Sequence, residues 1–357
     1  MPKDLNWKYD LEEYIRQGEP GKAEKSAAWQ TAIGLQDVDG LKTSDYLIET
    51  AKDHIEGKID IAQAKDRIHS YYEERKDRAD IEASTKEADI VAARITEILS
   101  EKTFQFSPAE LQSIHKRLFT GVFSHAGEFR TYNITKKEWI LNGDTVTYSA
   151  YDSIKDTLDY DFAQEKKFSY EGLSAEEAIK HISGFTSGIW QIHPFGEGNT
   201  RTTAVFILKY LRTFGFTFSN DAFAENSWYF RNALVRSNYN DFGKSITATN
   251  KYLDAFFENL ILGADHELKN RYMHVEYDSS QSDKDDISKC QNVTLKITME
   301  EAALLMHIKD DPNITQADLA EKMGKSKRTI IRRMSDLQAK GLIQRENGKR
   351  NGKWVIL

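Results

Sequence analysis

The sequence has little cysteine and no long apolar segment. Cys290 is the single cysteine among 357 residues, which excludes an intrachain disulfide and leaves no cluster of thiolates for zinc. No apolar run reaches the roughly 18 residues that indicate a membrane-spanning helix, and the N-terminus lacks the apolar stretch of a signal peptide. We therefore expect a soluble cytoplasmic protein with no membrane partner.

Charge is distributed unevenly along the chain. The net charge is −7, which alone argues against non-specific binding of nucleic acid by the whole molecule. Between Lys325 and Lys353, however, ten basic residues stand against two acidic ones. Hydrophobic residues make up 39% of the chain, enough for cores, and its length predicts roughly two or three domains.

The most informative stretch is His193-Pro-Phe-Gly-Glu-Gly-Asn-Thr-Arg201. Apolar residues recur at helical spacing on both sides, so two amphipathic helices should flank a short polar loop. The second helix would begin at this loop, where unpaired N–H groups and the helix dipole suit a phosphate. Gly196 and Gly198 would let the backbone approach an anion closely, and Arg201 could bind a phosphate through two hydrogen bonds.

Glu197 and His193 supply the remaining chemistry. Magnesium is usually held by one or two carboxylates plus phosphate oxygens, so Glu197 is a candidate ligand. An imidazole with an ordinary pKa near ~6.5 can take a proton from a hydroxyl at neutral pH, so His193 is a candidate general base. Taken singly, each residue is more often part of an exposed polar loop. The ordered set favours phosphoryl or nucleotidyl transfer.

This stretch resembles the signature His-x-Phe-x-Asp/Glu-Gly-Asn-Gly-Arg-x-x-Arg of the Fic family, whose members typically transfer AMP from ATP to protein hydroxyls. The resemblance implies ATP and Mg²⁺ as cofactors, His193 as base and Glu197 as metal ligand. The implied nucleotide-binding residues are Gly196, Gly198, Asn199, Thr200 and Arg201. Thr200 replaces the third glycine of the signature, and Ala204 replaces its final arginine, which in the family helps to hold the γ-phosphate. The nucleotide donor therefore stays open.

Two further segments fit the resemblance. Asn142-Gly143 lies between short β-prone runs and predicts a β-hairpin, whose free edge could accept an extended target segment. The family has a flap here, which implies that Val146, Thr147 and Tyr148 position the target; a hairpin without function is the alternative. The family also places adenosine near residues 228–234, which makes Tyr229 a candidate, although aromatics on such a helix more often belong to the core.

Residues 1–80 are expected to form a small helical bundle, and they resemble the antitoxins that silence Fic proteins. Those antitoxins carry Ser/Thr-x-x-x-Glu-Gly on an inhibitory helix. The best register here runs from Leu35 to Gly40, with Leu35 for the serine and Asp39 for the glutamate. In the family the glutamate pairs with the final motif arginine, which is Ala204 in this chain. We therefore expect Asp39 to lack a guanidinium partner, so that its substitution should release little activity.

The C-terminal region has a different character. Residues 276–292 are polar and predict a linker. Three short helices and a hairpin then resemble a winged helix-turn-helix, in which the helix after the turn typically enters the major groove of DNA. The basic patch fits duplex DNA. The candidate DNA-binding residues are Lys327, Arg328, Arg332, Arg333 and Lys349. Because winged helices also serve as protein docking modules, that alternative stays open.

Together these features predict a mainly α protein. It would comprise an antitoxin-like segment (1–80), a Fic-type helical core with a β-hairpin flap (81–275), a linker (276–292) and a small α+β winged helix-turn-helix domain (293–357). The leading function is transfer of AMP from Mg·ATP to a Ser, Thr or Tyr hydroxyl of a target protein, with a DNA-binding regulatory domain. The alternative is a transcriptional regulator whose degenerate Fic core only senses a nucleotide or ligand. A homodimer stays open.

Overall fold

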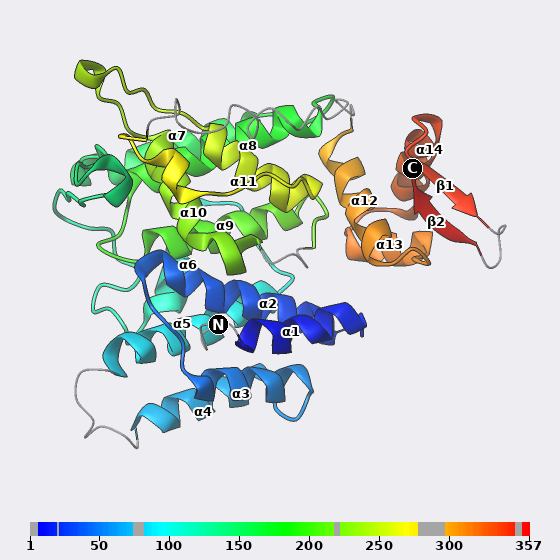
Figure 1. Ribbon diagram of the computed structural model, residues 1–357, viewed down its shortest axis with the longest axis horizontal. Coiled ribbons are helices and arrows are strands. Elements are labelled where there is room, and N and C mark those ends of the chain that lie inside the picture. The colour runs from blue at the N-terminus through cyan, green and yellow to red at the C-terminus, as the bar shows by residue number, and fades with distance from the viewer. Residues whose placement is uncertain (1–5, 20, 74–81, 218–221, 278–296, 347–351) are drawn as a thin grey trace.

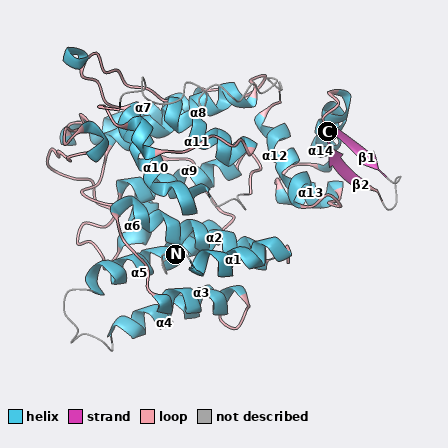
Figure 2. Cartoon of the chain, viewed as in Figure 1, coloured by secondary structure: helices cyan, strands magenta, loops and turns pink. Residues whose placement is uncertain are grey.

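The computed structural model describes residues 6–19, 21–73, 82–217, 222–277, 297–346 and 352–357. In Figure 1 a large helical body carries a smaller C-terminal domain at one side. Within the described residues, the sheet of two strands lies in that smaller domain (Figure 2). The expected mainly α fold with a small α+β domain is confirmed. None of the described helices is both long and apolar enough to cross a bilayer.

The N-terminal segment packs directly onto the rest of the body. It consists of α1 (Asn6–Gln17), α2 (Lys22–Gly34), the 3₁₀ helix η2 (Leu35–Asp39), α3 (Asp45–Ile55) and α4 (Ile61–Glu73). Helix α2 contacts α1, α5 (Glu82–Ser100) and α10 (Ala222–Ser237). A Cβ at Gly34 would lie 2.2 Å from the Cα of Ala224, so the close approach of α2 to α10 requires glycine. The expected boundary near residue 80 falls outside the described residues.

Helix α9 (Asn199–Arg212) runs through the centre of the core, and every residue from Asn199 to Leu211 is buried. It packs against α5, α6 (Pro108–Phe119) and α8 (Ala175–Ile192). The core is completed by α7 (Ile154–Lys167), α10, α11 (Lys251–Leu262) and the 3₁₀ helices η3 (Trp139–Leu141), η4 (Tyr151–Ser153), η5 (Phe242–Lys244) and η6 (Asn270–Met273). The loop between α8 and α9 is thus fixed by two buried helices.

Residues 131–150, which we call the flap, contain the expected turn but no strand. Asn142 and Gly143 have φ angles of 56° and 85°, the left-handed conformation that an Asn-Gly pair favours. The expected two-stranded hairpin is nevertheless wrong. The helix η3 occupies the place of its first strand, and the N–H of Gly143 donates to Glu138 O within a compact loop. Burial of Ile140 and Val146 against the body favours this compact loop over a projecting ribbon.

The C-terminal domain has the expected winged-helix elements. These are α12 (Met299–Asp310), α13 (Gln316–Lys322), α14 (Lys327–Ala339), β1 (Ile343–Glu346) and β2 (Lys353–Ile356). The strands pair antiparallel, with Gln344 opposite Val355. Helix α12 contacts α8 and α11 of the body. In addition, His307 Nε2 lies 3.0 Å from the carbonyl oxygen of Gly215 just after α9. Residues 347–351 lie outside the described residues, and with them the candidate Lys349.

Candidate functional site

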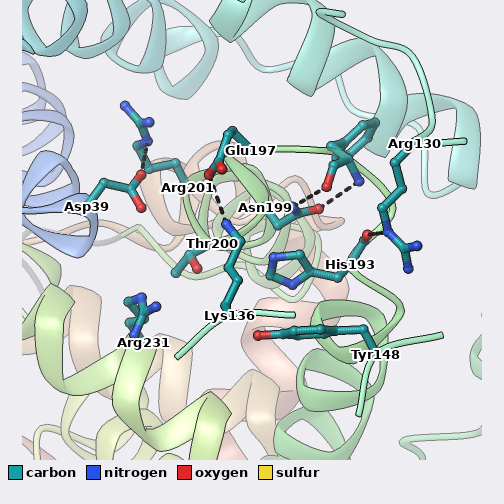
Figure 3. A network of polar contacts seen from close by, with 12 residues as sticks. Asp39, Arg130, Lys136, Tyr148, His193, Glu197, Asn199, Thr200, Arg201 and Arg231 are labelled. Atoms are coloured by element: carbon teal, nitrogen blue, oxygen red, sulfur yellow. Dashed lines mark hydrogen bonds and ion pairs between the residues drawn. The ribbon is translucent and has the colours of Figure 1, made fainter. Parts of the chain in front are cut away.

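The loop between α8 and α9 brings the motif residues together. His193 caps the end of α8 with φ 50° and ψ 58°, and Gly198, with φ 74°, precedes the first residue of α9. The side chain of Asn199 closes the loop, because its Oδ1 accepts from Phe195 N at 3.0 Å and its Nδ2 donates to Phe195 O at 2.8 Å (Figure 3). Asn199 therefore acts as an internal brace of the loop that presents the first N–H groups of α9.

His193 is held as a neutral base. Its Nδ1 lies 3.2 Å from the carbonyl oxygen of Trp190, and because a carbonyl can only accept, this contact places the proton on Nδ1. Nε2 is buried and has no hydrogen-bond partner among the described residues. Burial lowers the pKa of His193 well below 6.5, and the nearby charges of Lys136 and Arg130 act in the same direction. Nε2 is thus a free acceptor at neutral pH.

The flap lies over His193. The ring of Tyr148 is 4.3 Å from the imidazole, centroid to centroid (Figure 3). The carbonyl oxygen of Thr147 accepts a hydrogen bond from Gln191 Nε2 at 3.0 Å, while the Thr147 side chain is exposed and Val146 is buried. Of the three expected target-positioning residues, Tyr148 faces the histidine directly and Thr147 is the one that presents its side chain to solvent.

The carboxylate of Glu197 forms an ion pair with a lysine. Its exposed carboxylate Oε2 lies 2.8 Å from the ammonium of Lys136, which comes from the flap. Its backbone oxygen is held by His115 Nε2 at 3.0 Å, while Nδ1 of the same ring accepts from Gly127 N at 2.9 Å. Burial lowers the pKa of His115 to about 4, so this brace stays uncharged at neutral pH.

Glu197 fits a magnesium site of the kind that phosphates complete. An exposed carboxylate that pairs with an ammonium can also take a divalent cation. The described residues contain no group of three or more His, Cys, Asp or Glu side chains that could hold a metal by themselves. A metal at Glu197 would therefore depend on phosphate oxygens and water for its other ligands, as is usual for Mg²⁺.

Arg201 is engaged by the N-terminal half of the chain. Its Nε lies 2.8 Å from Asp39 Oδ2, its Nη2 2.7 Å from Glu87 Oε1, and its Nη1 3.1 Å from Gln36 Oε1. The contact with Asp39 is an ion pair without an aligned hydrogen bond. The expectation that Asp39 lacks a guanidinium partner is therefore wrong. The partner, Arg201, lies three residues before Ala204, almost one helical turn away on α9.

The motif glycines and Thr200 fit the interior of the protein. A Cβ at Gly198 would lie 2.4 Å from Cε2 of Phe119, and a Cβ at Gly196 would lie 3.0 Å from the hydroxyl of Tyr132. Packing therefore requires glycine at position 198, whereas at position 196 a side chain would need only a small shift of the exposed Tyr132. Thr200 replaces the third glycine without projecting into the loop, because its hydroxyl accepts from Trp190 Nε1 at 3.0 Å.

The remaining candidates for nucleotide and DNA binding lie on α10 and α14. Tyr229 is buried on α10, so its ring offers no open face to a base in this conformation. On α14, Lys327, Arg328 and Arg332 are exposed. Arg333 instead pairs with Glu300 of α12, Nε to Oε2 at 2.9 Å, and so holds two helices together.

Four side chains around the motif were not predicted from the sequence. They are Glu87, Arg130, Lys136 and Arg231. Arg130 alone had a local signal, since it ends the Gly127-Glu128-Phe129-Arg130 run before the flap. The others reach the site from distant helices or loops, which spacing along the chain cannot reveal.

Two parts of the chain match known protein families. Residues 105–211 match the Fic/DOC family, and residues 303–344 match a winged helix-turn-helix DNA-binding family. The chain thus contains a Fic/DOC domain followed by a winged helix. It is also similar to the protein adenylyltransferase VbhT of Bartonella schoenbuchensis, at 30% identity over 112 residues. That region covers 31% of this chain and only 22% of VbhT, so the chain spans about a fifth of its relative's length.

Proposed function

We propose that the protein transfers AMP from Mg·ATP to a serine, threonine or tyrosine hydroxyl of a target protein. The observation that carries this proposal is the state of His193, a buried imidazole protonated on Nδ1 with a free Nε2. His193 lies at one end of the loop between α8 and α9, and the N-terminus of the buried helix α9 forms the other end. The N-terminus of a helix favours the binding of a phosphate. The similarity of the Fic/DOC domain to a protein adenylyltransferase supports the same reaction.

In the proposed reaction the target hydroxyl oxygen attacks the α-phosphorus of ATP. Nε2 of His193 takes the hydroxyl proton, and pyrophosphate leaves as the bond to the β-phosphate breaks. The N–H groups around Gly198, Asn199 and Thr200 bind phosphate oxygens. Glu197 would hold Mg²⁺, which neutralises phosphate charge when bound. The flap residues Val146 to Tyr148 would position the target segment.

The proposed phosphate contact of Arg201 requires an exchange of partners. Its guanidinium is engaged by Asp39, Glu87 and Gln36, so a phosphate must displace at least one of them. Asp39 is the more exposed of the two carboxylates, because 34% of its side chain is accessible to solvent, against 22% for Glu87. We propose that Asp39 yields first, and that the N-terminal segment restrains nucleotide binding through this contact.

The test is incubation with labelled ATP and cell lysate. His193→Ala should lower labelling by the 10²- to 10⁴-fold that a general base typically contributes. His266→Ala is a control, because the partly buried His266 lies in the segment after α11 and pairs with Glu258 of that helix at 2.5 Å. Undiminished labelling by a folded His193→Ala variant would rule the mechanism out. DNA binding without any His193-dependent label would favour the alternative, a regulator whose core senses a nucleotide.

We also propose that the winged helix binds duplex DNA. Arg328 and Arg332 are exposed and lie four residues apart, on one face of α14. Arg328→Ala and Arg332→Ala should weaken the binding of a fluorescent duplex titrated at several salt concentrations. Each phosphate contact that is lost should flatten the slope of log K against log[salt] by ~0.9. Arg333→Ala should instead lower the melting temperature, since Arg333 pairs with Glu300. Absence of salt-dependent affinity for duplex DNA would point to a protein partner.

A further inference from the structure

Arg130 contacts the loop between α8 and α9 and is only 4% exposed. Its guanidinium donates to backbone carbonyls: Nε to His193 O at 2.8 Å, Nη1 to Tyr132 O at 2.7 Å, and Nη2 to Ile192 O at 3.2 Å and to Ser149 O. Its own backbone N–H donates to Pro194 O at 2.9 Å. Figure 3 shows the contact between Arg130 and His193.

These acceptors form two groups. The carbonyls of Ile192, His193 and Pro194 are consecutive and surround the proposed base. The carbonyls of Tyr132 and Ser149 lie at the two ends of the flap. One side chain therefore ties the backbone of His193 to both ends of the segment that covers it.

The chemistry of the position favours arginine. No described carboxylate forms an ion pair with Arg130, and burial lowers the pKa of its guanidinium. A buried charge is costly unless hydrogen bonds compensate it, and here carbonyl oxygens supply them. Ile192 ends α8, so its carbonyl lacks a partner within the helix, and a cation there also suits the helix dipole. A planar fork of five N–H donors spans such a set of acceptors, whereas an ammonium cannot.

His193 needs this support. It is one of three described non-glycine residues with positive φ, a conformation that costs free energy and persists only where the surroundings impose it. Three of the contacts of Arg130 fall on His193 and its two neighbours in the chain.

We propose that Arg130 is a positioning residue that fixes His193 and the flap in a single arrangement, so that base and target segment keep their register. The contacts stand without any assumption about the reaction, while the consequence for catalysis rests on the proposed AMP transfer. The test is therefore divided into a readout of flap opening and a readout of turnover.

The first readout is hydrogen exchange of the full chain without nucleotide. In Arg130→Lys, amides of residues 133–148 should exchange at least about tenfold faster, since losing even one or two net hydrogen bonds changes an opening equilibrium by that factor. Amides in α9 should keep their rates. Arg94→Lys is the matched control, because the half-buried Arg94 also donates to a backbone carbonyl, Nη1 to Leu118 O at 2.9 Å, away from the flap.

Unchanged flap exchange in a folded Arg130→Lys variant would overturn the proposal. Equal acceleration in α9 and in the flap would also overturn it, because that is the signature of a general loss of stability. Should Arg130→Lys fail to fold, Arg130→Gln is measured in the same way.

The second readout separates catalysis from binding. Arg130→Lys should lower kcat and raise KM for the target at least about tenfold, while the Kd for ATP stays within about twofold. Unchanged kcat and KM, with an opened flap, would overturn the catalytic part of the proposal. If the wild-type protein transfers no AMP, the proposed function fails while the exchange result still decides the structural role of Arg130.

Discussion

Asp39→Asn should tighten the binding of ATP. The substitution keeps the shape of the side chain and removes one of the two negative charges that contact Arg201. Sequence alone predicts little effect, because it gives Asp39 no partner. In the structure, only 2% of the Arg201 side chain is exposed. Each of the three guanidinium nitrogens contacts a side chain from the N-terminal half of the chain. A phosphate can bind Arg201 only by competing with these contacts.

The expected size of the effect follows from the geometry. A hydrogen bond to a charged group contributes about 1.5–3 kcal/mol net, but the contact of Asp39 is unaligned and a third exposed. We therefore expect about 1–2 kcal/mol, or roughly 5- to 30-fold in the Kd for ATP. Glu87→Gln should act in the same direction. The double variant should not be additive, because both carboxylates share Arg201.

Calorimetric titration of ATP into the His193→Ala background would measure this effect without turnover. The control is Asp53→Asn, which removes a carboxylate paired with Arg67 at 2.8 Å on the far side of the N-terminal bundle. Unchanged ATP affinity in Asp39→Asn, together with a lowered melting temperature, would show that the ion pair exists but does not compete with ATP. Weaker ATP binding would refute the reasoning outright.

Two other perturbations test the site. Lys136→Met should tighten Mn²⁺ binding to the ATP-bound His193→Ala protein by up to about fivefold, since it frees the carboxylate of Glu197 from a partly exposed ion pair. An electron paramagnetic resonance titration measures this binding, and equal tightening by Lys137→Met would contradict the explanation. Burial lowers the pKa of His115 from 6.5 to about 4, so between these pH values the folded protein binds fewer protons at this group than the unfolded chain does. The free energy of unfolding should therefore fall as the pH drops from about 6.5 to 4, by up to ~3 kcal/mol from His115. Urea titrations should show a smaller pH dependence in His115→Gln, and an identical dependence would contradict the assignment.

Local chemistry was predictable from the sequence, and long-range pairing was not. The loop between two amphipathic helices, the start of α9 after Gly198 and the turn at Asn142-Gly143 all depend on residues within a few positions of one another. The partners of Arg201 do not: Glu87 lies 114 positions away and Gln36 lies 165. No periodicity encodes such contacts, because they depend on how α5 and η2 pack against α9.

The flap shows how tertiary structure overrides local preference. The short β-prone runs on either side of Asn142-Gly143 predict strands. However, Ile140 and Val146 are both buried, and Ile140 O accepts from Val275 N in the segment after α11. Packing onto the body thus replaces pairing between the two arms of the flap. The same packing places Glu138 where Arg231 can pair with it at 2.6 Å, which no hairpin register would have suggested.

The contacts around the motif also differ in how readily a ligand could replace them. Arg130 is buried and makes hydrogen bonds to fixed backbone carbonyls, so it should hold its position. Lys136 and Asp39 are each about a third exposed and engage Glu197 and Arg201 through side chains alone. On the proposed function, Mg²⁺ would take the place of the ammonium on Glu197, and a phosphate that of Asp39 on Arg201. Each exchange keeps the sign of the charge that it replaces, so nucleotide could enter with the motif backbone held in place by Arg130.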